Sequence, residues 1–557
     1  MRKLVIGLAC VAAVTAAACK DALTTPDLNQ PDIARSFGTP STLSGLIATN
    51  FAQIHNGLMN TSTALDPQLM VAAFESYGTV ANFSMALREG LPRTQVDNSR
   101  GNFSAAENFR DFQQMSRQAR YATNYIQALD SLTKLGGHLS FPSGDEAADA
   151  INLKGEDLRA RSFAFFNNGV ALGWLAMEYD SAAITTAATR ADSTPPLSSY
   201  KDVMTTALAM MDSAIAIASS PGAAAGFPLP DDYFLGSNYT EPQYVALIRS
   251  FKARFRAGVS RTPAERDAVD WAAVLADATN GIQSDFVLDI DSQELGLSWL
   301  DAQMFQNNSA GWHQMSMMIF GMADTSGAYD AWIKLPLSSR PYILIKTPDK
   351  RWPSGDTRAA QQANSPANSA WDYTKYPYIR NRSNSDTPGE PWGSSFYDFY
   401  RFKALNVANP HAGPWIAMAK TEMDMLAAEA YIRKGDYASA ATLINKSRTK
   451  AGLPPVTGTQ DGGLSGATCV PRVPTSAGNA TQCGDLMEAM KYEKRMETAY
   501  TGYGQWYFDE RGWGDLAEGT PLEWPVPFQE MDARGHPFYN LGGIGGPMGA
   551  AKGTYGF

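Results

Sequence analysis

The stretch that most constrains this chain is a pair of helical patterns between Trp415 and Leu453. The first pattern places four apolar side chains on one helical face, namely Met423, Leu426, Ala430 and Tyr431. Gly435 then suits a helix end, and Asp436 can cap a second helix whose face carries Ala440, Ala441 and Ile444. Two such helices form a tetratricopeptide-like hairpin, which cannot bury its apolar face alone. We therefore expect further helices to stack on it.

Other segments repeat the helical pattern on both sides of this hairpin. Helices are predicted over 105–135, 156–179, 200–219, 241–257, 271–282 and 486–500. Asp285 to Asp291 alternates apolar and polar residues and predicts a strand. From Leu300 to Pro414 the helical periodicity is weak, and Gly, Pro and aromatic residues are dense. The predicted fold class is mostly α: tetratricopeptide-like hairpins form a scaffold, with a loop-rich irregular subdomain inserted in the middle.

The N-terminus is typical of an export signal. Met1 to Lys3 is basic, Leu4 to Ala18 is apolar and too short to span a bilayer, and three alanines precede Cys19. Small residues before a cysteine are typical of a bacterial lipoprotein leader, which predicts a lipid on Cys19. An ordinary signal peptide cut near Ala18 is the alternative. Residues 24–31 are polar and contain proline, which indicates a tether between the lipid and the body.

Charge argues against a nucleic-acid partner. Loss of residues 1–18 removes Arg2 and Lys3 and leaves 44 basic against 56 acidic residues, a net charge of −12. A net acidic body without a basic run lacks the electrostatic footprint of a nucleic-acid-binding protein. No segment after the leader reaches the length of a transmembrane helix.

The cysteine count predicts one disulfide. Cys10 leaves with the leader and Cys19 is the expected lipid site, so Cys469 and Cys483 remain. An even pair in an exported protein favours a disulfide, worth on the order of 3 kcal/mol. A metal site would need further ligands, and no His or other Cys lies in the loop between them.

The C-terminal segment resembles a known family. Glu493 to Glu497 (EKRME) is similar to the ERRxEL-like helix end of the SusD/RagB nutrient-binding outer-membrane lipoproteins. Trp506 to Trp513 matches their aromatic D-x-x-R-W segment, and Pro525 to Glu530 matches their PIPxxE-like turn. Thr501-Gly502 stands where the family has Glu-Gly. Two earlier segments also resemble family landmarks: Lys154 to Tyr179 resembles the early helix, and the hairpin with Ala428-Glu429-Ala430 resembles the AEA-bearing helix pair. All these segments occur in the order that the family has, so the chain resembles a divergent member.

The resemblance implies an α-helical body that sits on a TonB-dependent transporter barrel and captures a glycan or other oligomeric nutrient. It implies no enzymatic activity, no cofactor, and a lipid-anchored position at the outer membrane, exposed on the cell surface. We expect a leader over 1–18, a tether over 19–35 and one SusD-like body over 36–557. Within the body we expect helical parts over about 36–285 and 414–557, with the irregular ligand-side region over about 286–413.

Catalytic motifs are missing from the sequence. The five histidines are scattered, and there is no G-x-S-x-G, phosphate-binding glycine loop or EF-hand loop. Carboxylate pairs such as Asp289 with Asp291 could serve glycoside hydrolysis. Because 56 acidic residues make such pairs unavoidable, we interpret them as surface and capping residues. An all-α glycosidase stays the enzyme alternative.

Aromatic and amide residues gather in the irregular middle. Seven of the twelve tryptophans lie there: Trp299, Trp312, Trp332, Trp352, Trp371, Trp392 and Trp415. Aromatic faces pack on sugar rings while amides bind hydroxyl groups, and loops also use aromatics as small cores. The family resemblance points to ligand contacts in 83–103 and 299–332. The predicted ligand-binding residues are Arg93, Asn98, Trp299, Gln303, Asn307, Trp312 and Trp332, with no metal ligand among them. Trp506, Tyr507 and Trp513 are interpreted as packing residues.

Two function classes remain beside the glycosidase. A nutrient-binding lipoprotein predicts an aromatic and polar face on loops. A tetratricopeptide-like adaptor lipoprotein that binds another protein predicts a groove lined by helix side chains. Loop composition does not encode the linkage or identity of a substrate, so the sequence leaves starch-like, pectic, host-glycan and peptide ligands open.

Overall fold

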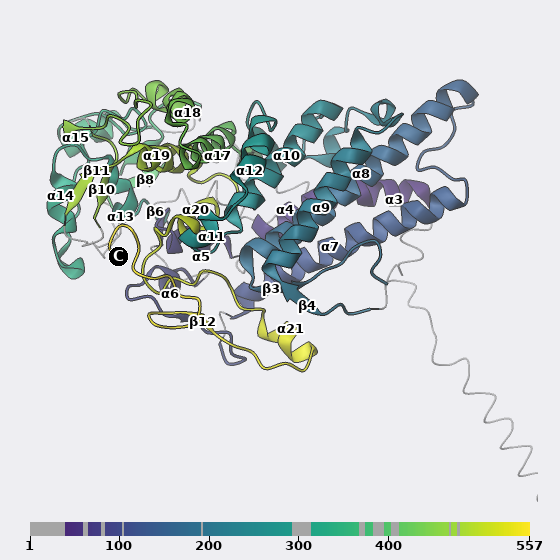
Figure 1. The fold of residues 1–557 in the computed structure, drawn as a ribbon, viewed down its shortest axis with the longest axis horizontal. Coiled ribbons are helices and arrows are strands. Elements are labelled where there is room, and N and C mark those ends of the chain that lie inside the picture. Colours follow the sequence, from purple (N-terminus) through teal and green to yellow (C-terminus); the bar gives the residue numbers. More distant parts are fainter. Residues whose placement is uncertain are drawn as a thin grey trace, which may run out of the picture.

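The computed structural model describes residues 39–59, 65–78, 84–102, 105–190, 193–291, 313–366, 374–382, 395–402, 412–466, 469–475 and 480–557. The predicted leader, the tether and Cys19 lie outside these ranges, as do Trp299, Gln303, Asn307 and Trp312. The described chain is mostly α-helical, and its short strands pair two by two (Figure 1). The predicted fold class is confirmed.

Helix α8 is the centre of the N-terminal part. It packs against α7 along one side and α9 along the other (Figure 1). The predicted stripe is fully buried at Phe163, Phe166 and Val170. The helices of this part are α3 (Pro40–Ala48), α4 (Asn50–Met59), α5 (Asp66–Ala72), α6 (Met85–Glu89), α7 (Ala105–Lys134), α8 (Glu146–Glu178), α9 (Tyr200–Ala218), α10 (Glu241–Gly258), α11 (Pro263–Asp267) and α12 (Trp271–Thr279).

Helix α8 begins ten residues before its predicted start. The Asp145 side chain accepts hydrogen bonds from the backbone N–H groups of Ala147 and Ala148, both at 3.1 Å. This N-cap satisfies two of the donors that a helix start leaves free. The apolar periodicity becomes regular only after Glu156, so the sequence pattern missed the polar, exposed first turns.

The hairpin predicted from Trp415 to Leu453 is present as α17 (Lys420–Arg433) and α18 (Tyr437–Lys450). Gly435 has a φ of 77°, and Asp436 caps α18 through the N–H of Ser439 at 3.1 Å. The hairpin packs on α19 through a separate small core that includes Met425, Ala440 and Leu486. Helices therefore stack on the hairpin as expected.

The predicted helical stretch begins at Trp415, but residues 415–418 belong to a strand. The assignment of these residues to a helix was wrong. Strand β9 (Ala412–Met418) pairs antiparallel with β5 (Phe286–Asp291), the strand predicted from alternation. Trp415 lies opposite Leu288. Asp285 then accepts a hydrogen bond from the Lys420 N–H at 2.7 Å, which fixes the start of α17 beside the strand pair. A distant strand partner decided this local structure.

The middle of the chain is an irregular set of short elements packed on the helices. It comprises β6 (His313–Gln314), α13 (Met317–Phe320), η5 (Gly321–Ala323), α14 (Ala328–Ile333), η6 (Leu337–Ser339), α15 (Arg358–Ala363), β7 (Ile379–Asn381) and β8 (Tyr397–Phe399). Arg351 ties this region to α19 (Leu486–Thr498), since its guanidinium contacts Asp349 at 2.7 Å and Glu493 at 2.9 Å. All three side chains are fully buried.

The C-terminal motif residues are interior charges. Within α19, Arg495 pairs with Glu510 at 3.0 Å and Asp515 at 2.7 Å, and Lys494 pairs with Asp509 at 2.7 Å. Trp506 and Tyr507 of α20 (Gln505–Trp513) are buried, as the packing interpretation requires. The remaining elements are β1 (Tyr77–Gly78), β2 (Gln95–Val96), β3 (Ser181–Ala183), β4 (Leu197–Ser199), η2 (Ala223–Gly226), η3 (Asp231–Tyr233), β10 (Arg472–Pro474), β11 (Thr481–Cys483), α21 (Phe528–Ala533) and β12 (Leu541–Gly542).

A disulfide joins Cys469 to Cys483 across a Cα–Cα distance of 5.8 Å, at the end of the β10–β11 hairpin. Among the helices in the described ranges, none combines the length and the apolar character needed to cross a membrane.

Candidate functional site

The region predicted to carry ligand contacts, 83–103, contains two short elements joined by irregular segments. Its described residues, 84–102, include α6 and β2, and α6 packs on α5 and β1. Strand β2 pairs antiparallel with β12 from the C-terminal tail, so Val96 lies opposite Leu541. Two segments more than 400 residues apart in the chain thus form one surface (Figure 1).

This surface contains a hollow of about 300 Å³, which we call the polar hollow. Its lining comes from α5, α6, the loop through β2 and the start of α7, and consists of Gln68, Ser84, Leu87, Arg88, Thr94, Gln95, Val96, Asp97, Asn102 and Asn108. Amide and hydroxyl groups dominate the lining. Side chains of this kind bind hydroxyl-rich ligands by hydrogen bonds.

Two buried amides in the polar hollow carry unused hydrogen-bonding atoms. Gln68 is 1% exposed and Asn108 is 3% exposed. Within the described ranges, Gln68 Nε2 and Asn108 Oδ1 have no hydrogen-bond partner. A buried polar atom without a partner costs roughly 1 to 3 kcal/mol. One unused donor and one unused acceptor therefore make these two amides candidates for contact with a polar ligand group.

Arg88 shapes one wall of the polar hollow. Its guanidinium donates to the backbone carbonyls of Thr94 at 3.3 Å and Gln95 at 3.1 Å. The same arginine is 5% exposed. These bonds hold the chain between α6 and β2 in a fixed path, which leaves the Thr94 and Gln95 side chains exposed.

Asn98 was predicted to bind the ligand, but the structure makes it an anchor. It is fully buried, and its Nδ2 donates to the carbonyls of Val526 at 2.9 Å and Tyr539 at 3.3 Å. Its Oδ1 accepts from the Phe528 N–H at 3.0 Å. The amide has no atom left for a ligand, and it fixes the loop to the Pro525–Glu530 turn.

Arg93 and Trp332 are also parts of the interior. Arg93 is 3% exposed, donates to the Ala72 carbonyl at 3.0 Å and lies 4.9 Å from the centroid of the Phe74 ring. Burial lowers its pKa to about 9. Trp332 is 1% exposed and donates from Nε1 to the Pro341 carbonyl at 2.8 Å. Neither side chain lines the polar hollow.

The tryptophans of the irregular middle divide into two sets. Trp332, Trp352 and Trp415 are buried and serve as core. Trp299, Trp312, Trp371 and Trp392 lie outside the described residues. The expectation of an exposed ring in this region therefore stays a prediction for those four.

A strand pair brings the two predicted ligand regions together. Strand β1 precedes the 83–103 region in the chain, and β6 lies within the predicted 299–332 region. The two strands are antiparallel, with Tyr77 opposite Gln314 and Gly78 opposite His313. The Gly78 N–H also donates to Glu89 Oε2 at 2.5 Å, which ties β1 to α6. Burial raises the pKa of Glu89 to about 8.

Part of the lining of the polar hollow falls within the predicted range 83–103, but the buried amides Gln68 and Asn108 lie outside that range. Gln68 stands in an otherwise apolar segment of α5, DPQLMVA, and Asn108 lies in the polar start of α7. A lone amide within an apolar helix was the one signal available, and it does not distinguish a ligand contact from a satisfied core residue.

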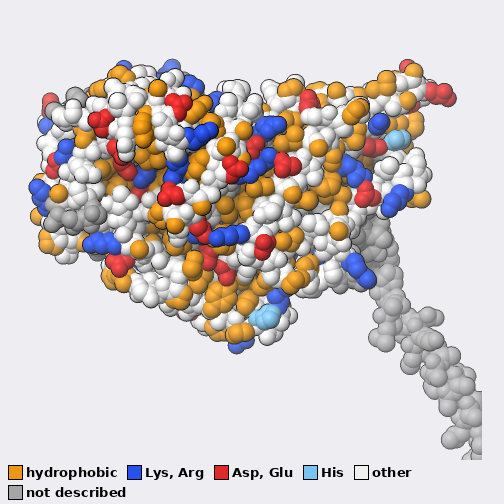
Figure 2. Space-filling view, in the orientation of Figure 1, with side chains coloured by type: hydrophobic (Ala, Val, Ile, Leu, Met, Phe, Trp, Pro, Cys, Tyr) orange, Lys and Arg blue, Asp and Glu red, His pale blue; other side chains and the backbone are white. Residues whose placement is uncertain are grey.

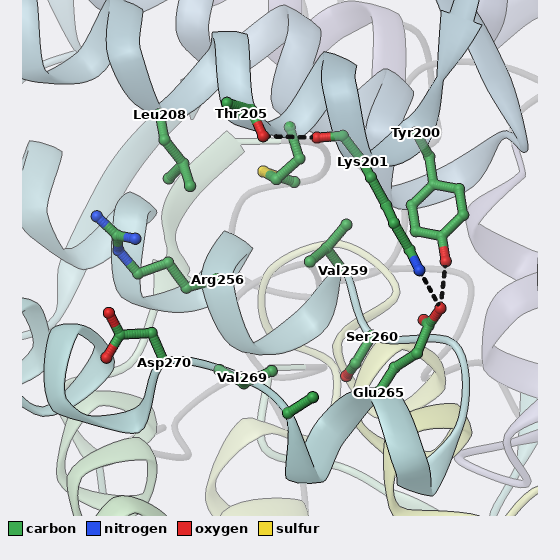
Figure 3. Close-up of a pocket in the computed structure, with 12 residues that line it drawn as sticks. Tyr200, Lys201, Thr205, Leu208, Arg256, Val259, Ser260, Glu265, Val269 and Asp270 are labelled. Carbon is green, nitrogen blue, oxygen red and sulfur yellow. Dashed lines mark hydrogen bonds and ion pairs between the residues drawn. The ribbon is translucent and has the colours of Figure 1, made fainter.

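A second hollow of about 320 Å³, which we call the apolar groove, lies between α9, α10 and α11 (Figure 3). Leu208, Val259 and Val269 line it. At one end, the Tyr200 hydroxyl donates to Glu265 at 2.6 Å and Lys201 contacts the same oxygen at 2.8 Å. Burial opposes ionisation of Glu265, but hydrogen bonds from Lys201 and Tyr200 hold its pKa below its usual value. The charges at this end are thus already paired.

Metal-binding chemistry is not supported in the described ranges, which hold no group of three or more His, Cys, Asp or Glu side chains suited to a metal ion. His55 is buried, and burial lowers its pKa to about 4, so it stays neutral near pH 7.

No family model matches the sequence, and no curated protein matches it. Solved structures match the fold. A SusD superfamily protein from Bacteroides thetaiotaomicron is 12% identical with a TM-score of 0.50, over 89% of this chain and 98% of that one. A surface glycan-binding protein A from Bacteroides uniformis is 10% identical with a TM-score of 0.51, over the same shares. At these identities the likeness establishes the fold alone.

Proposed function

We propose that this chain, which has the fold of the SusD superfamily, is a cell-surface lipoprotein that binds an oligosaccharide-like nutrient. Binding takes place at the polar hollow and the neighbouring β1–β6 surface. The lipid on Cys19 holds the body at the outer membrane, and a TonB-dependent transporter barrel receives the ligand. The chain itself carries out no reaction on the nutrient.

One observation carries the proposal, namely the pair of unused amide atoms in a hollow lined by polar side chains. Gln68 Nε2 offers a donor and Asn108 Oδ1 offers an acceptor. A sugar hydroxyl can accept from the first and donate to the second. The glycan-binding protein that shares the fold is consistent with this ligand class.

The test is calorimetric titration of soluble glucans, pectic polysaccharides and host-type glycans into the protein. We expect at least one glycan to bind, and Gln68→Met to weaken that binding roughly three- to tenfold, since one hydrogen bond is lost. Methionine fits the apolar helix, so the substitution should leave the fold intact, as circular dichroism can check. Thr205→Val, in the apolar groove, is the matched control and should change nothing.

The apolar groove favours one alternative, the adaptor lipoprotein, because helix side chains line it. That alternative predicts no heat with any glycan and a protein ligand whose binding depends on Leu208 and Val259. Loss of glycan binding in Thr205→Val but not in Gln68→Met would also contradict the proposed site.

A further inference from the structure

The end of the α7–α8 hairpin carries the most exposed apolar side chains of the described residues. Leu135 is 86% exposed, Phe141 is 79% exposed and Ile151 is 59% exposed. They lie at the end of α7, in the connecting loop and in the second turn of α8, a region that we call the hairpin tip. Scattered single apolar residues are normal on surfaces, whereas a group at one projecting end indicates a binding surface.

The loop of the hairpin tip is held in place by acidic side chains of α8. The Leu139 N–H donates to Asp157 at 2.9 Å, and the Ser143 N–H donates to Asp149 at 2.9 Å. The loop therefore runs back along the first turns of α8, and Phe141 lies over the same stretch as Ile151. Its exposure is a property of an ordered loop whose polar groups are already paired with α8.

The first described residues of the chain lie on the same side of the molecule. Helix α4 runs parallel to α8, since Phe51 stacks on Phe166 at 6.1 Å and Leu58 lines a small cavity with Trp174. Helix α3 precedes α4 and also contacts α7 and α8 (Figure 1). Because α4 lies along the part of α8 from Phe166 to Trp174, the preceding helix α3 contacts α8 nearer to its start. The chain thus enters the body close to the hairpin tip.

We propose that the hairpin tip rests on the lipid surface to which the chain is anchored, with Leu135, Phe141 and Ile151 in the interface. The proposal rests on the lipid on Cys19 in the proposed function. Residues 19–38 can span at most about 70 Å, so the anchored end can reach the surface beside the tip. The tip meets the interfacial layer, where partly inserted apolar side chains add to the hold of one lipid chain.

The charge of the hairpin tip indicates which kind of lipid surface it can contact. Asp145, Glu146 and Asp149 lie at the start of α8 and outnumber Lys134 at the end of α7; Figure 2 shows acidic, basic and apolar side chains together at this end of the molecule. Acidic side chains are repelled by anionic lipids. The surface that fits is therefore zwitterionic.

The experiment uses the mature lipoprotein in phosphatidylcholine vesicles. Pro142→Cys places a single reactive thiol beside Phe141, since Cys469 and Cys483 are bonded and Cys19 carries the lipid. A polarity-sensitive fluorophore at residue 142 should shift to the blue. Nitroxide lipids should quench it at least about twofold more than the same label at Gln460→Cys, which lies between α18 and α19. Adding Leu135→Ser, Phe141→Ser and Ile151→Ser to Pro142→Cys should abolish the difference.

Co-flotation with the vesicles and glycan titration separate the possible failures. A protein that floats while its label at 142 stays in water overturns the proposal and leaves the anchor standing. A label that becomes shielded only when outer-membrane proteins are added overturns it in favour of a protein partner. A protein that does not float removes the anchor and the proposal together, while glycan binding remains measurable on its own.

Discussion

Glu429 shows how single charges are used inside this protein. It is fully buried on α17, and its carboxylate accepts two hydrogen bonds from Arg266, at 2.9 and 2.6 Å. Burial alone would raise its pKa, but Arg266 outweighs burial, with help from Arg433 and Lys494, and lowers the pKa to about 2. The carboxylate thus stays ionised near pH 7.

Glu429→Gln tests this arrangement. The substitution leaves Arg266 short of its main countercharge and should reduce the free energy of unfolding at pH 7 by roughly 3 to 5 kcal/mol, measured by urea denaturation. A carboxyl group with a lowered pKa stabilises above about pH 4.5, and this stabilisation disappears as the pH falls towards 2. The loss at pH 7 should therefore shrink in acid.

The control is Asp267→Asn. Asp267 is an exposed partner of Arg433, so this variant should change the free energy of unfolding by less than about 1 kcal/mol. Equal effects of the two variants would contradict the account.

At the scale of elements, α6 forms one wall of the polar hollow and packs on β1, and Glu89 joins these two elements. Its pKa is raised to about 8 by burial, so it is protonated when the pH is near 6. The stabilisation from a raised carboxyl pKa is complete below about pH 4.5 and is lost as the pH rises through 8. The wall should therefore loosen in mild base.

Glu89→Gln keeps the shape and an acceptor for the Gly78 N–H but cannot ionise. Between pH 5 and 8 the wild-type protein should lose about 3 kcal/mol more of its free energy of unfolding than the variant does. Urea denaturation at several pH values measures this difference. Parallel pH profiles for the two proteins would show that Glu89 does not titrate in this range.

Elements with strong periodicity could be predicted from the sequence, and those decided by distant partners could not. The stripe of Phe163, Phe166 and Val170 identified α8, and Gly435 with Asp436 identified the α17–α18 turn. Trp415 looked helical because β5, its pairing partner, is more than a hundred residues away. The predicted site residues show the same division. Asn98 proved to be an anchor because its partners lie in the C-terminal turn.

At the scale of the whole molecule, buried ion pairs join the irregular middle and the helical scaffold into one packed unit. Arg351 connects the middle to α19, and Arg254 on α10 donates to Glu422 of α17 at 2.6 Å. The motif residues of the C-terminal segment belong to this packed unit. The polar hollow lies at its edge, where the C-terminal tail meets α6 and β2, and the hairpin tip projects from the N-terminal part (Figure 1). The scaffold, the proposed ligand surface and the proposed membrane contact are thus separate regions of one chain.

Hydrogen exchange with and without a bound oligosaccharide tests the central claim most directly. The ligand should be the best-binding glycan from the titrations. The account predicts slower exchange in α5 and in residues 84–102, with α9 and α11 around the apolar groove unchanged, because the ligand orders only the backbone that it contacts. Protection confined to α9, α10 and α11, or no protection by any glycan that binds, would contradict it.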